Sequence, residues 1–326
     1  MPKTKHTGQP GDCSPEQERC LTEIRDYVES TYSHFKSQTI DDWFLLKFCR
    51  ARKFNLKKVM LMLDKYFEFH QTHDVSNILQ ATNKVPEYTK ILSDNRHKSW
   101  FGFTKDGTPF EVNSRNHWND ENIVNGVPVE PYKQHFIKDC EEAQKVVLPI
   151  ASKIAGRRID KFSVLFDLKD ASIKQFFQTK IRNYLNIETL ICEQFYPECL
   201  GKLWVINCPW YISSIYALFK PMLAEETKKK IFILGSNYAE ELAKDIDLDQ
   251  LPEFIGGTKI DEYPNTVNPF QFYIAECEKQ GTYVLEPELR NDPNWIPPSD
   301  PWERAKTICL NPEELLEKIS RRTLEG

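Results

Sequence analysis

Few residues in this chain have the types and spacing that catalysis requires. His70 and His73, in the segment FHQTHD, come closest to metal-ligand spacing, but no Cys or acidic companion completes a zinc pattern. Asp167 and Lys169 are the pair that a small-molecule enzyme would use, although a structural role is the simpler interpretation. The turns KDASIK and CPWYIS, which follow two apolar runs, contain no glycine that would let the backbone approach a pyrophosphate. These observations favour a function without bound metal, nucleotide or covalent chemistry.

Composition and charge narrow the classes of function further. The 326 residues suffice for roughly two domains and a sizeable core. The 43 Lys and Arg against 48 Asp and Glu give a net charge of −5, which disfavours a nucleic-acid partner. Nine scattered cysteines without a CxxC pair indicate reduced thiols and a cytosolic protein. The longest uncharged stretch, 203–219, has 17 residues and includes Asn207 and Pro209, which is short and polar for a membrane span. The first residues contain no apolar run of the kind that a secretory signal needs.

The first eighty-odd residues predict a small layer of helices. Ser14 followed by Pro15, with a glutamine three residues after the serine, is a strong helix start. A second helix is expected to begin near Asp41 and a third after Asn55, each with apolar residues at helical spacing. Residues 1–13 are expected to form a flexible lead.

From about residue 100 the pattern predicts an α/β unit. The Asp-Gly turn within 104–112 is typical of a hairpin, and a long helix is expected over 131–154. Three β-rich runs follow, separated by segments of helical periodicity, which predicts a largely parallel sheet with right-handed crossovers. These runs are 162–168, 203–207 and 231–234, and a last helix is expected over 312–322.

The helix predicted after the second β-rich run is apolar on more than one face. Trp210, Tyr211 and Leu218 add apolar surface beside its main stripe. A buried core helix is the simpler explanation; the alternative is a mobile helix that covers a lipid cavity and touches a bilayer when it opens. The stripe consists of Ile212, Ile215, Tyr216, Phe219, Met222 and Leu223.

Several blocks of the sequence resemble the CRAL-TRIO family of lipid-binding proteins. WFLLKFCRARKFNLKKVMLML, at 43–63, is similar to its N-terminal signature, and three later blocks are similar to its lipid domain. These blocks are 195–210, 219–235 and 251–257. The order and spacing also fit, over about residues 14–260, and the branch that the chain resembles is that of the phosphatidylinositol-transfer proteins. The resemblance implies a helical CRAL-TRIO-N region at 14–95, a CRAL-TRIO domain at 96–260 and a C-terminal extension at 261–326.

The resemblance also implies how such a fold would carry a lipid. The helical layer would be followed by an α/β domain whose mixed, largely parallel sheet floors a hydrophobic pocket, and the stripe at 212–223 matches the helix that gates it. Two acyl tails contain about 30 methylenes, and exposing them to water costs on the order of 25 kcal/mol. An enclosed apolar cavity that opens at a membrane would avoid this cost without covalent chemistry.

The resemblance further implies a site for the phosphatidylinositol headgroup. Arg52 and Lys53 match the family's basic pair, Glu198 matches the acid of its YPE motif, and Thr227 with Lys230 match a pair before the last core strand. The cations would balance the phosphodiester, the hydroxyl would donate to its oxygens, and the carboxylate would accept from inositol hydroxyls. Taken alone, the same residues could be ordinary helix-end charges and a solvated lysine run.

The chain departs from the family pattern where relatives bind phosphatidylcholine. Those relatives have small hydroxyl residues on one strand and tyrosines near the hairpin, whereas this chain has Phe162 and Val164 on the strand. The aligned hairpin positions are Trp100 and Glu111. A choline phosphate buried there would lose hydrogen bonds worth about 1–3 kcal/mol per unsatisfied group. We therefore expect poor phosphatidylcholine binding and, as a second ligand, a sterol or another apolar molecule.

The sequence thus predicts a cytoplasmic, non-enzymatic protein that binds and transfers phosphatidylinositol. The lipid would be a ligand and not a cofactor, and contact with membranes would be peripheral and transient. The resemblance implies presentation of the lipid to a phosphoinositide kinase, and we expect a monomer without a nucleic-acid partner. Two alternatives stay open: a lipid sensor or scaffold whose segment 260–326 contacts a protein, and a small-molecule enzyme that uses Asp167 and Lys169.

Overall fold

The computed structural model describes most of the chain up to residue 258. The described ranges are 6–33, 35, 40–79, 86–95, 97–114, 120–155, 157–171 and 178–258. The predicted C-terminal extension at 261–326, with its last helix, lies outside them. Within the described residues, no helix combines the length and the apolar character needed to traverse a bilayer.

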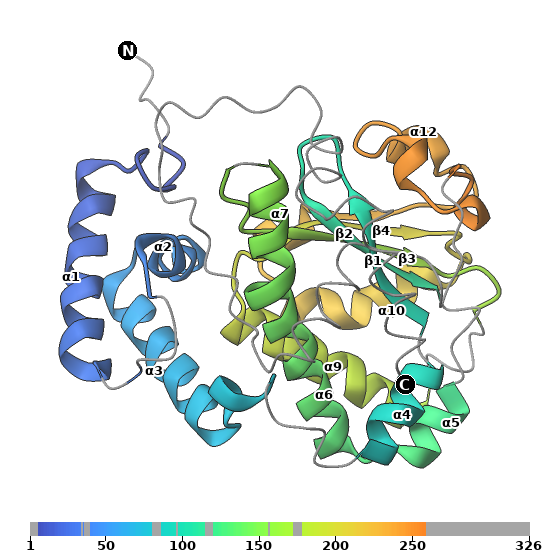
Figure 1. The fold of residues 1–326 in the computed structure, drawn as a ribbon, viewed down its shortest axis with the longest axis horizontal. Helices are drawn as coiled ribbons and strands as arrows, with labels where there is room; N and C mark the ends of the chain where they lie inside the picture. The colour runs from blue at the N-terminus through green and yellow to red at the C-terminus, as the bar shows by residue number, and fades with distance from the viewer. Residues whose placement is uncertain are drawn as a thin grey trace, which may run out of the picture. The chain divides into compact units, whose positions relative to one another are not determined.

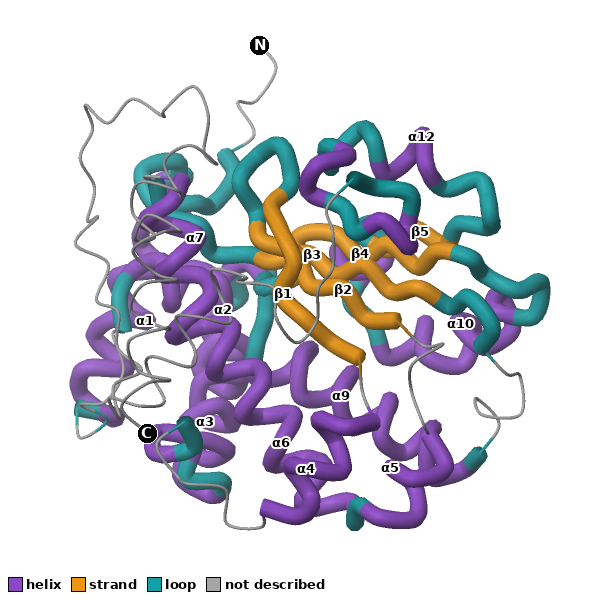
Figure 2. Tube along the Cα trace, turned by 45° about the vertical axis from the view of Figure 1, so that its right-hand side comes forward, coloured by secondary structure: helices purple, strands orange, loops and turns teal. Residues whose placement is uncertain are grey.

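Helices come first and then mix with strands, as the sequence predicts (Figures 1 and 2). The main helices are α1 (Pro15–Tyr32), α2 (Asp42–Ala51), α3 (Leu56–Thr72), α4 (Pro86–Asn95), α5 (Asp120–Gly126), α6 (Val129–Glu142), α7 (Leu148–Ala155), α9 (Thr179–Phe195), α10 (Ile212–Phe219), α11 (Glu225–Lys228) and α12 (Ala239–Leu242). The strands are β1 (His97–Phe103), β2 (Pro109–Ser114), β3 (Phe162–Asp167), β4 (Leu200–Ile206) and β5 (Ile231–Ile233).

The first three helices pack against one another as a layer (Figure 1). Each begins where a side chain satisfies a free backbone N–H: Ser14 caps α1 in a capping box, Asp41 caps α2, and Asn55 caps α3. Their apolar stripes meet in a core in which Ile24 and Leu63 have no exposed surface. The predicted caps and the predicted helical layer are confirmed.

The strands hydrogen-bond in the order β1-β2-β3-β4-β5, and the sheet is mixed and largely parallel. β1 and β2 are joined by the predicted Asp-Gly turn, in which the Thr108 carbonyl accepts from the Thr104 N–H at 2.9 Å. β4 and β5 run parallel, with Leu203 opposite Ile231 and Val205 opposite Ile233. The α/β fold class predicted from the sequence is therefore confirmed.

The two faces of the central strands are packed to different degrees. Along β3, Leu165 and Asp167 are buried, whereas the alternate residues Val164 and Phe166 are partly exposed. β4 repeats this alternation, since Trp204 is fully buried while its neighbours Leu203 and Val205 are partly exposed. One face of these two strands is thus solidly packed, and the other is apolar but incompletely covered.

The described chain divides into two compact units that do not follow sequence order. One contains residues 1–97, 113–141 and 164–236, and the other contains 98–112, 142–163 and 237–258 among the described residues. The first unit contains α1 to α3, β4, β5 and α10, as well as every residue of the predicted headgroup site.

Two predicted helices differ in detail from the observed ones. The helix expected over 131–154 spans α6 and α7, with a π turn at Ala143–Val147 between them. The helix carrying the apolar stripe ends at Phe219, because Pro221 cannot continue it and Lys220–Met222 forms a 3-10 turn. Met222 and Leu223 therefore do not share the α10 stripe, and the expectation of one continuous helix to 223 was wrong.

Candidate functional site

Arg52 and Lys53 occupy a tight loop that ends α2. The Arg52 N–H is bonded to the carbonyls of Phe48 and Cys49, and the chain then takes left-handed φ values of 51° at Lys53 and 56° at Phe54. Non-glycine residues in this region cost of order 1–3 kcal/mol each and persist where their surroundings hold them, commonly at ligand sites. The Lys53 side chain is exposed and that of Arg52 partly so, which leaves both cations accessible to an anion.

Glu198 lies in a second strained loop, between α9 and β4, with a φ of 57°. Two residues before it, the buried Tyr196 hydroxyl donates to Glu141 Oε1 at 2.8 Å. Burial, and next the Glu141 carboxylate, raise the pKa of the Tyr196 phenol well above its usual value, so it stays a donor. One residue after it, the buried Cys199 Sγ accepts from Lys47 Nζ at 3.7 Å. Contacts of these two buried neighbours therefore fix the chain on both sides of Glu198.

Lys230, from the segment that precedes β5, lies beside Glu198. Its Nζ lies 3.8 Å from Glu198 Oε2, and both side chains are largely buried, with 24% and 19% of their surfaces exposed. The reason is topological: Glu198 and Lys230 precede β4 and β5, and adjacent parallel strands begin at the same edge of a sheet. Thr227 lies in the turn before Lys230, where its carbonyl accepts from the Lys230 N–H at 3.0 Å.

Glu226 lies near cations of these loops and was not predicted from the sequence. Its pKa is lowered first by a hydrogen bond from Lys229, with smaller contributions from the charges of Lys53 and Lys230. Lys53 and Lys230 therefore both lie near the Glu226 carboxylate, although they are far apart in the chain. The signal that could have revealed Glu226 is the EETKKK run, which places acids three residues before lysines.

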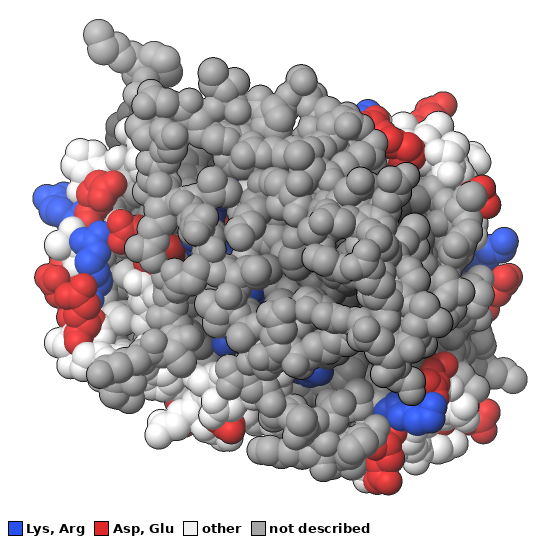
Figure 3. All heavy atoms as spheres, viewed as in Figure 1, with Lys and Arg blue, Asp and Glu red and all other residues white. Residues whose placement is uncertain are grey.

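The predicted headgroup residues are thus brought together to different extents. The structure pairs Glu198 with Lys230 and places Lys53 within electrostatic range of Glu226. The contacts described for the other two are local: Arg52 Nη1 donates to the Ala51 carbonyl, and Thr227 takes part through its backbone. Where described residues are visible near the rim of Figure 3, Lys and Arg side chains lie beside Asp and Glu side chains. The pairing of Glu198 with Lys230 suits a ligand with both hydroxyl groups and a phosphate.

The helix α10 lies against the incompletely covered sheet face (Figure 2). Ile212 and Ile215 are its buried contacts, and they pack with apolar side chains from all three neighbouring strands. Tyr216 and Phe219 are partly exposed, as are Met222 and Leu223 in the following turn. The outer side is far more open, with 89% of Trp210 and 52% of Leu218 exposed. This helix is therefore a core element on one side and an apolar surface on the other.

The positions predicted for a second ligand are apolar or already paired. Trp100 is buried and meets the Phe162 ring edge-on, with centroids 5.4 Å apart. Glu111 is also buried, and its Oε2 forms an ion pair with Lys98 Nζ at 2.9 Å. Val164 lies on the partly exposed side of β3.

The residues considered for enzyme or metal chemistry have structural contacts. The buried Asp167 carboxylate accepts from the Lys169 N–H at 2.9 Å and from Asn207 Nδ2 at 2.8 Å, so it closes the turn after β3. The His70 ring packs against Tyr66 in a tilted arrangement, whereas His73 Nδ1 contacts Gln134 Nε2 at 3.0 Å. Among the described residues, no group of three or more His, Cys, Asp or Glu side chains is arranged to hold a metal ion.

Comparison with known sequences decides the family. Residues 20–65 match the N-terminal domain of CRAL/TRIO proteins, and residues 94–257, half of the chain, match the CRAL/TRIO domain. The chain belongs to the CRAL/TRIO family. As a CRAL/TRIO protein it is of the lipid-binding and lipid-transfer class, and the resemblance noted in its sequence is confirmed.

Three relatives with one name match most of this chain and most of their own length. The SEC14 cytosolic factor of Kluyveromyces lactis is 31% identical over 78% of this chain and 83% of its own. The protein of the same name from Candida glabrata is 31% identical over 78% and 82%. That from Eremothecium gossypii is 28% identical over 94% and 92%. The crystal structure of Sfh5 shares the fold, with a TM-score of 0.60 at 15% identity over 82% of this chain and 97% of that one.

Proposed function

We propose that this CRAL/TRIO protein binds one phosphatidylinositol molecule and exchanges it at membrane surfaces. The observation that carries the proposal is the Glu198–Lys230 pair, which comes from separate segments and lies at the strand edge where β4 and β5 begin. Lys230 would contact the phosphodiester while Glu198 accepts from inositol hydroxyls, and Lys53 adds a second cation.

The partly exposed sheet face supplies a place for the acyl tails. It runs from this polar edge towards α10, along side chains such as Leu203 and Val205. A strand of the length of β4 spans roughly 20 Å at ~3.3 Å per residue, longer than the ~15 Å of one bilayer leaflet. We propose that this face floors the lipid pocket, and that α10 is the gate through which the lipid leaves.

The second-ligand positions support poor binding of phosphatidylcholine. The Trp100 and Phe162 rings pack edge-on against each other, and the Glu111 carboxylate is already paired with Lys98. The ring surfaces suit a sterol or another apolar molecule better than a choline phosphate. We therefore propose that a second ligand, where one binds, is of this apolar kind.

The setting that we propose is cytoplasmic, with peripheral and transient contact with membranes. The names of the relatives, SEC14 cytosolic factor, support the compartment. We further propose that the protein presents the lipid to a phosphoinositide kinase and that it is a monomer. Its function would be to bind the lipid, without catalysing a reaction.

The test is transfer of labelled phosphatidylinositol between vesicles by the wild type, Glu198→Ala and Lys230→Ala. Each substitution removes a charged hydrogen bond worth about 1.5–3 kcal/mol, so transfer should fall roughly tenfold or more. Lys244→Ala is a matched control, because it also breaks a lysine–glutamate pair, with Glu241 on α12.

Equal transfer by all four proteins would refute the assigned headgroup site. Tight retention of the lipid without transfer would instead favour the lipid-sensor alternative. Faster transfer of phosphatidylcholine than of phosphatidylinositol would overturn the assignment of the second-ligand positions.

A further inference from the structure

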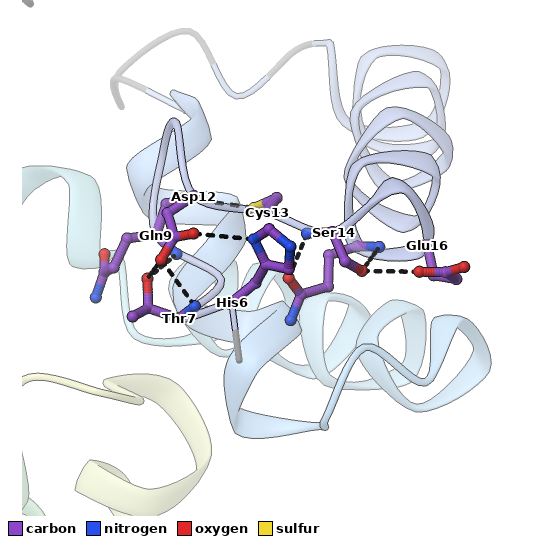
Figure 4. Close-up of polar contacts among 8 residues, drawn as sticks. His6, Thr7, Gln9, Asp12, Cys13, Ser14 and Glu16 are labelled. Carbon is purple, nitrogen blue, oxygen red and sulfur yellow. Dashed lines mark hydrogen bonds and ion pairs between the residues drawn. The ribbon is translucent and has the colours of Figure 1, made fainter. Parts of the chain in front are cut away.

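Residues 6–12, which the sequence predicted to belong to a flexible lead, form a hydrogen-bonded turn that we call the N-terminal clasp. The Asp12 carboxylate gathers its start: it accepts from the Thr7 N–H at 3.0 Å and the Thr7 hydroxyl at 2.6 Å, and it contacts His6 Nδ1 at 2.9 Å (Figure 4). Backbone bonds close the turn, from the Gly8 N–H to the Asp12 carbonyl and from the Asp12 N–H to the Gln9 carbonyl.

The clasp contacts the loop that carries Arg52 and Lys53 at two points. Before the basic pair, Arg50 Nη1 donates to the Gly8 carbonyl at 3.0 Å. After the pair, the ring of Phe54 lies so close to Gly8 that a Cβ atom added there would be 2.7 Å from Phe54 Cζ. Gly8 also has a φ of +71°, so both the space and the backbone at this position require glycine.

The loop itself needs support from outside. Lys53 and Phe54 are consecutive non-glycine residues with left-handed φ, a conformation that isolated chains avoid. Such residues persist only where neighbouring structure fixes them. The clasp holds Arg50 on one side of the basic pair and Phe54 on the other, which is the support that this backbone requires.

We propose that the N-terminal clasp is a positioning element for the anion-binding pair Arg52 and Lys53. By fixing the left-handed loop, it presents the two cations in the orientation that binds the phosphodiester of an inositol lipid. This inference rests on the proposed function and extends it to a segment outside both regions that match the family, 20–65 and 94–257.

The experiment compares two glycine substitutions in the full chain. Gly8→Ala forces a Cβ against Phe54, whereas Gly11→Ala changes a glycine of similar φ, +81°, that has open space around it. Binding of labelled phosphatidylinositol is measured at equilibrium, together with hydrogen exchange of the Lys53 and Phe54 amides. Gly8→Ala should lower affinity about tenfold and speed exchange of both amides, and Gly11→Ala should do so clearly less.

A second pair of variants tests the clasp without steric conflict. Thr7→Val removes the hydroxyl that donates to Asp12 at nearly constant shape, and Thr7→Ser restores it. Thr7→Val should lower affinity about threefold, and Thr7→Ser should return it to the wild-type value. If Gly8→Ala does not fold, this pair decides the question alone.

Lys53→Ala separates the two proposals. If it leaves phosphatidylinositol binding unchanged, the proposed headgroup site fails. If it weakens binding while Thr7→Val and Gly8→Ala bind as the wild type does, the clasp proposal is overturned and the site stands. Val59→Ala, in the core of the helical layer, provides the remaining control. If Val59→Ala lowers the affinity as much as Gly8→Ala does, the loss reflects general destabilisation, and the clasp proposal is overturned.

Discussion

The helical layer and the α10 face of the sheet use similar apolar side chains in opposite ways. In the layer of α1 to α3, residues such as Leu63 and Val59 are completely buried, and Tyr32 stacks on Phe67 with ring centroids 4.0 Å apart. Around α10, apolar side chains of the strands are only partly covered, and Trp210 is 89% exposed. Apolar composition is thus the same signal for a filled core and for a partly exposed face, and the degree of burial separates the two.

The largest expected effect compares two leucines that differ in burial. Leu63→Ala opens a cavity in the helical layer and should reduce the free energy of unfolding by about 2–5 kcal/mol. Leu203→Ala, on the partly exposed face of β4, should cost less than about 1.5 kcal/mol, because less contact is lost there. Urea denaturation of the lipid-free protein measures both.

Lipid binding should reverse the order of these two leucines. Leu203→Ala should weaken binding of phosphatidylinositol, and Leu63→Ala should leave it unchanged at temperatures where the variant is folded. If Leu203→Ala proved as destabilising as Leu63→Ala and bound lipid normally, both faces of the sheet would be ordinary core, and the proposed pocket floor would be wrong.

An intermediate effect is expected where the packed region supports the headgroup site. Tyr196→Phe removes the donor to the buried Glu141 and should cost about 1–3 kcal/mol of stability. Because Tyr196 anchors the strained loop of Glu198, affinity for phosphatidylinositol should also fall severalfold. Thermal unfolding and equilibrium lipid binding give the two values.

Tyr184→Phe is the matched control for this prediction. Tyr184 is also buried, and its hydroxyl donates to the Val127 carbonyl at 2.6 Å, within the cluster around α5 and α9. The control should lose comparable stability and keep its affinity for lipid. Equal losses of affinity in both variants would show that Tyr196 supports the fold in general and not Glu198 in particular.

The smallest effect on stability is expected on the outer side of α10. Trp210→Ala should change the free energy of unfolding by less than about 0.5 kcal/mol, because the side chain has little contact to lose. Its indole is suited to the interface of a bilayer, so binding to phosphatidylinositol vesicles in a flotation assay should weaken measurably. Unchanged vesicle binding would remove Trp210 from the proposed membrane contact.

Local signals in the sequence predicted much of the architecture. The caps at Ser14, Asp41 and Asn55 act over three residues, so the starts of α1 to α3 could be recognised without knowledge of the rest of the chain. The alternation of helical and β-rich segments likewise predicted the α/β class. The signal that ends α10 is also local, because Pro221 is visible in the sequence. The apolar stripe continues past this proline, and for that reason the helix was expected to continue to residue 223.

The site depended on contacts that no local pattern contains. Nothing in the residue types of Lys53, Phe54 or Glu198 predicts a left-handed backbone. The contacts beside these residues, Gly8 against Phe54 and Tyr196 on Glu141, join segments that are far apart in the chain. The effect of Lys53 on the pKa of Glu226 likewise comes from a distant part of the chain.

The sequence by itself determined the family, the class of fold, the helical layer and the residue types available for a headgroup. Tertiary structure decided that Glu198 meets Lys230, that one face of β3 and β4 is buried while the other is partly exposed, and that residues 6–12 contact the basic loop. The physical reason is range: capping and periodicity act within a few residues, whereas burial and ion pairing between distant segments exist only after parallel strands have aligned their ends.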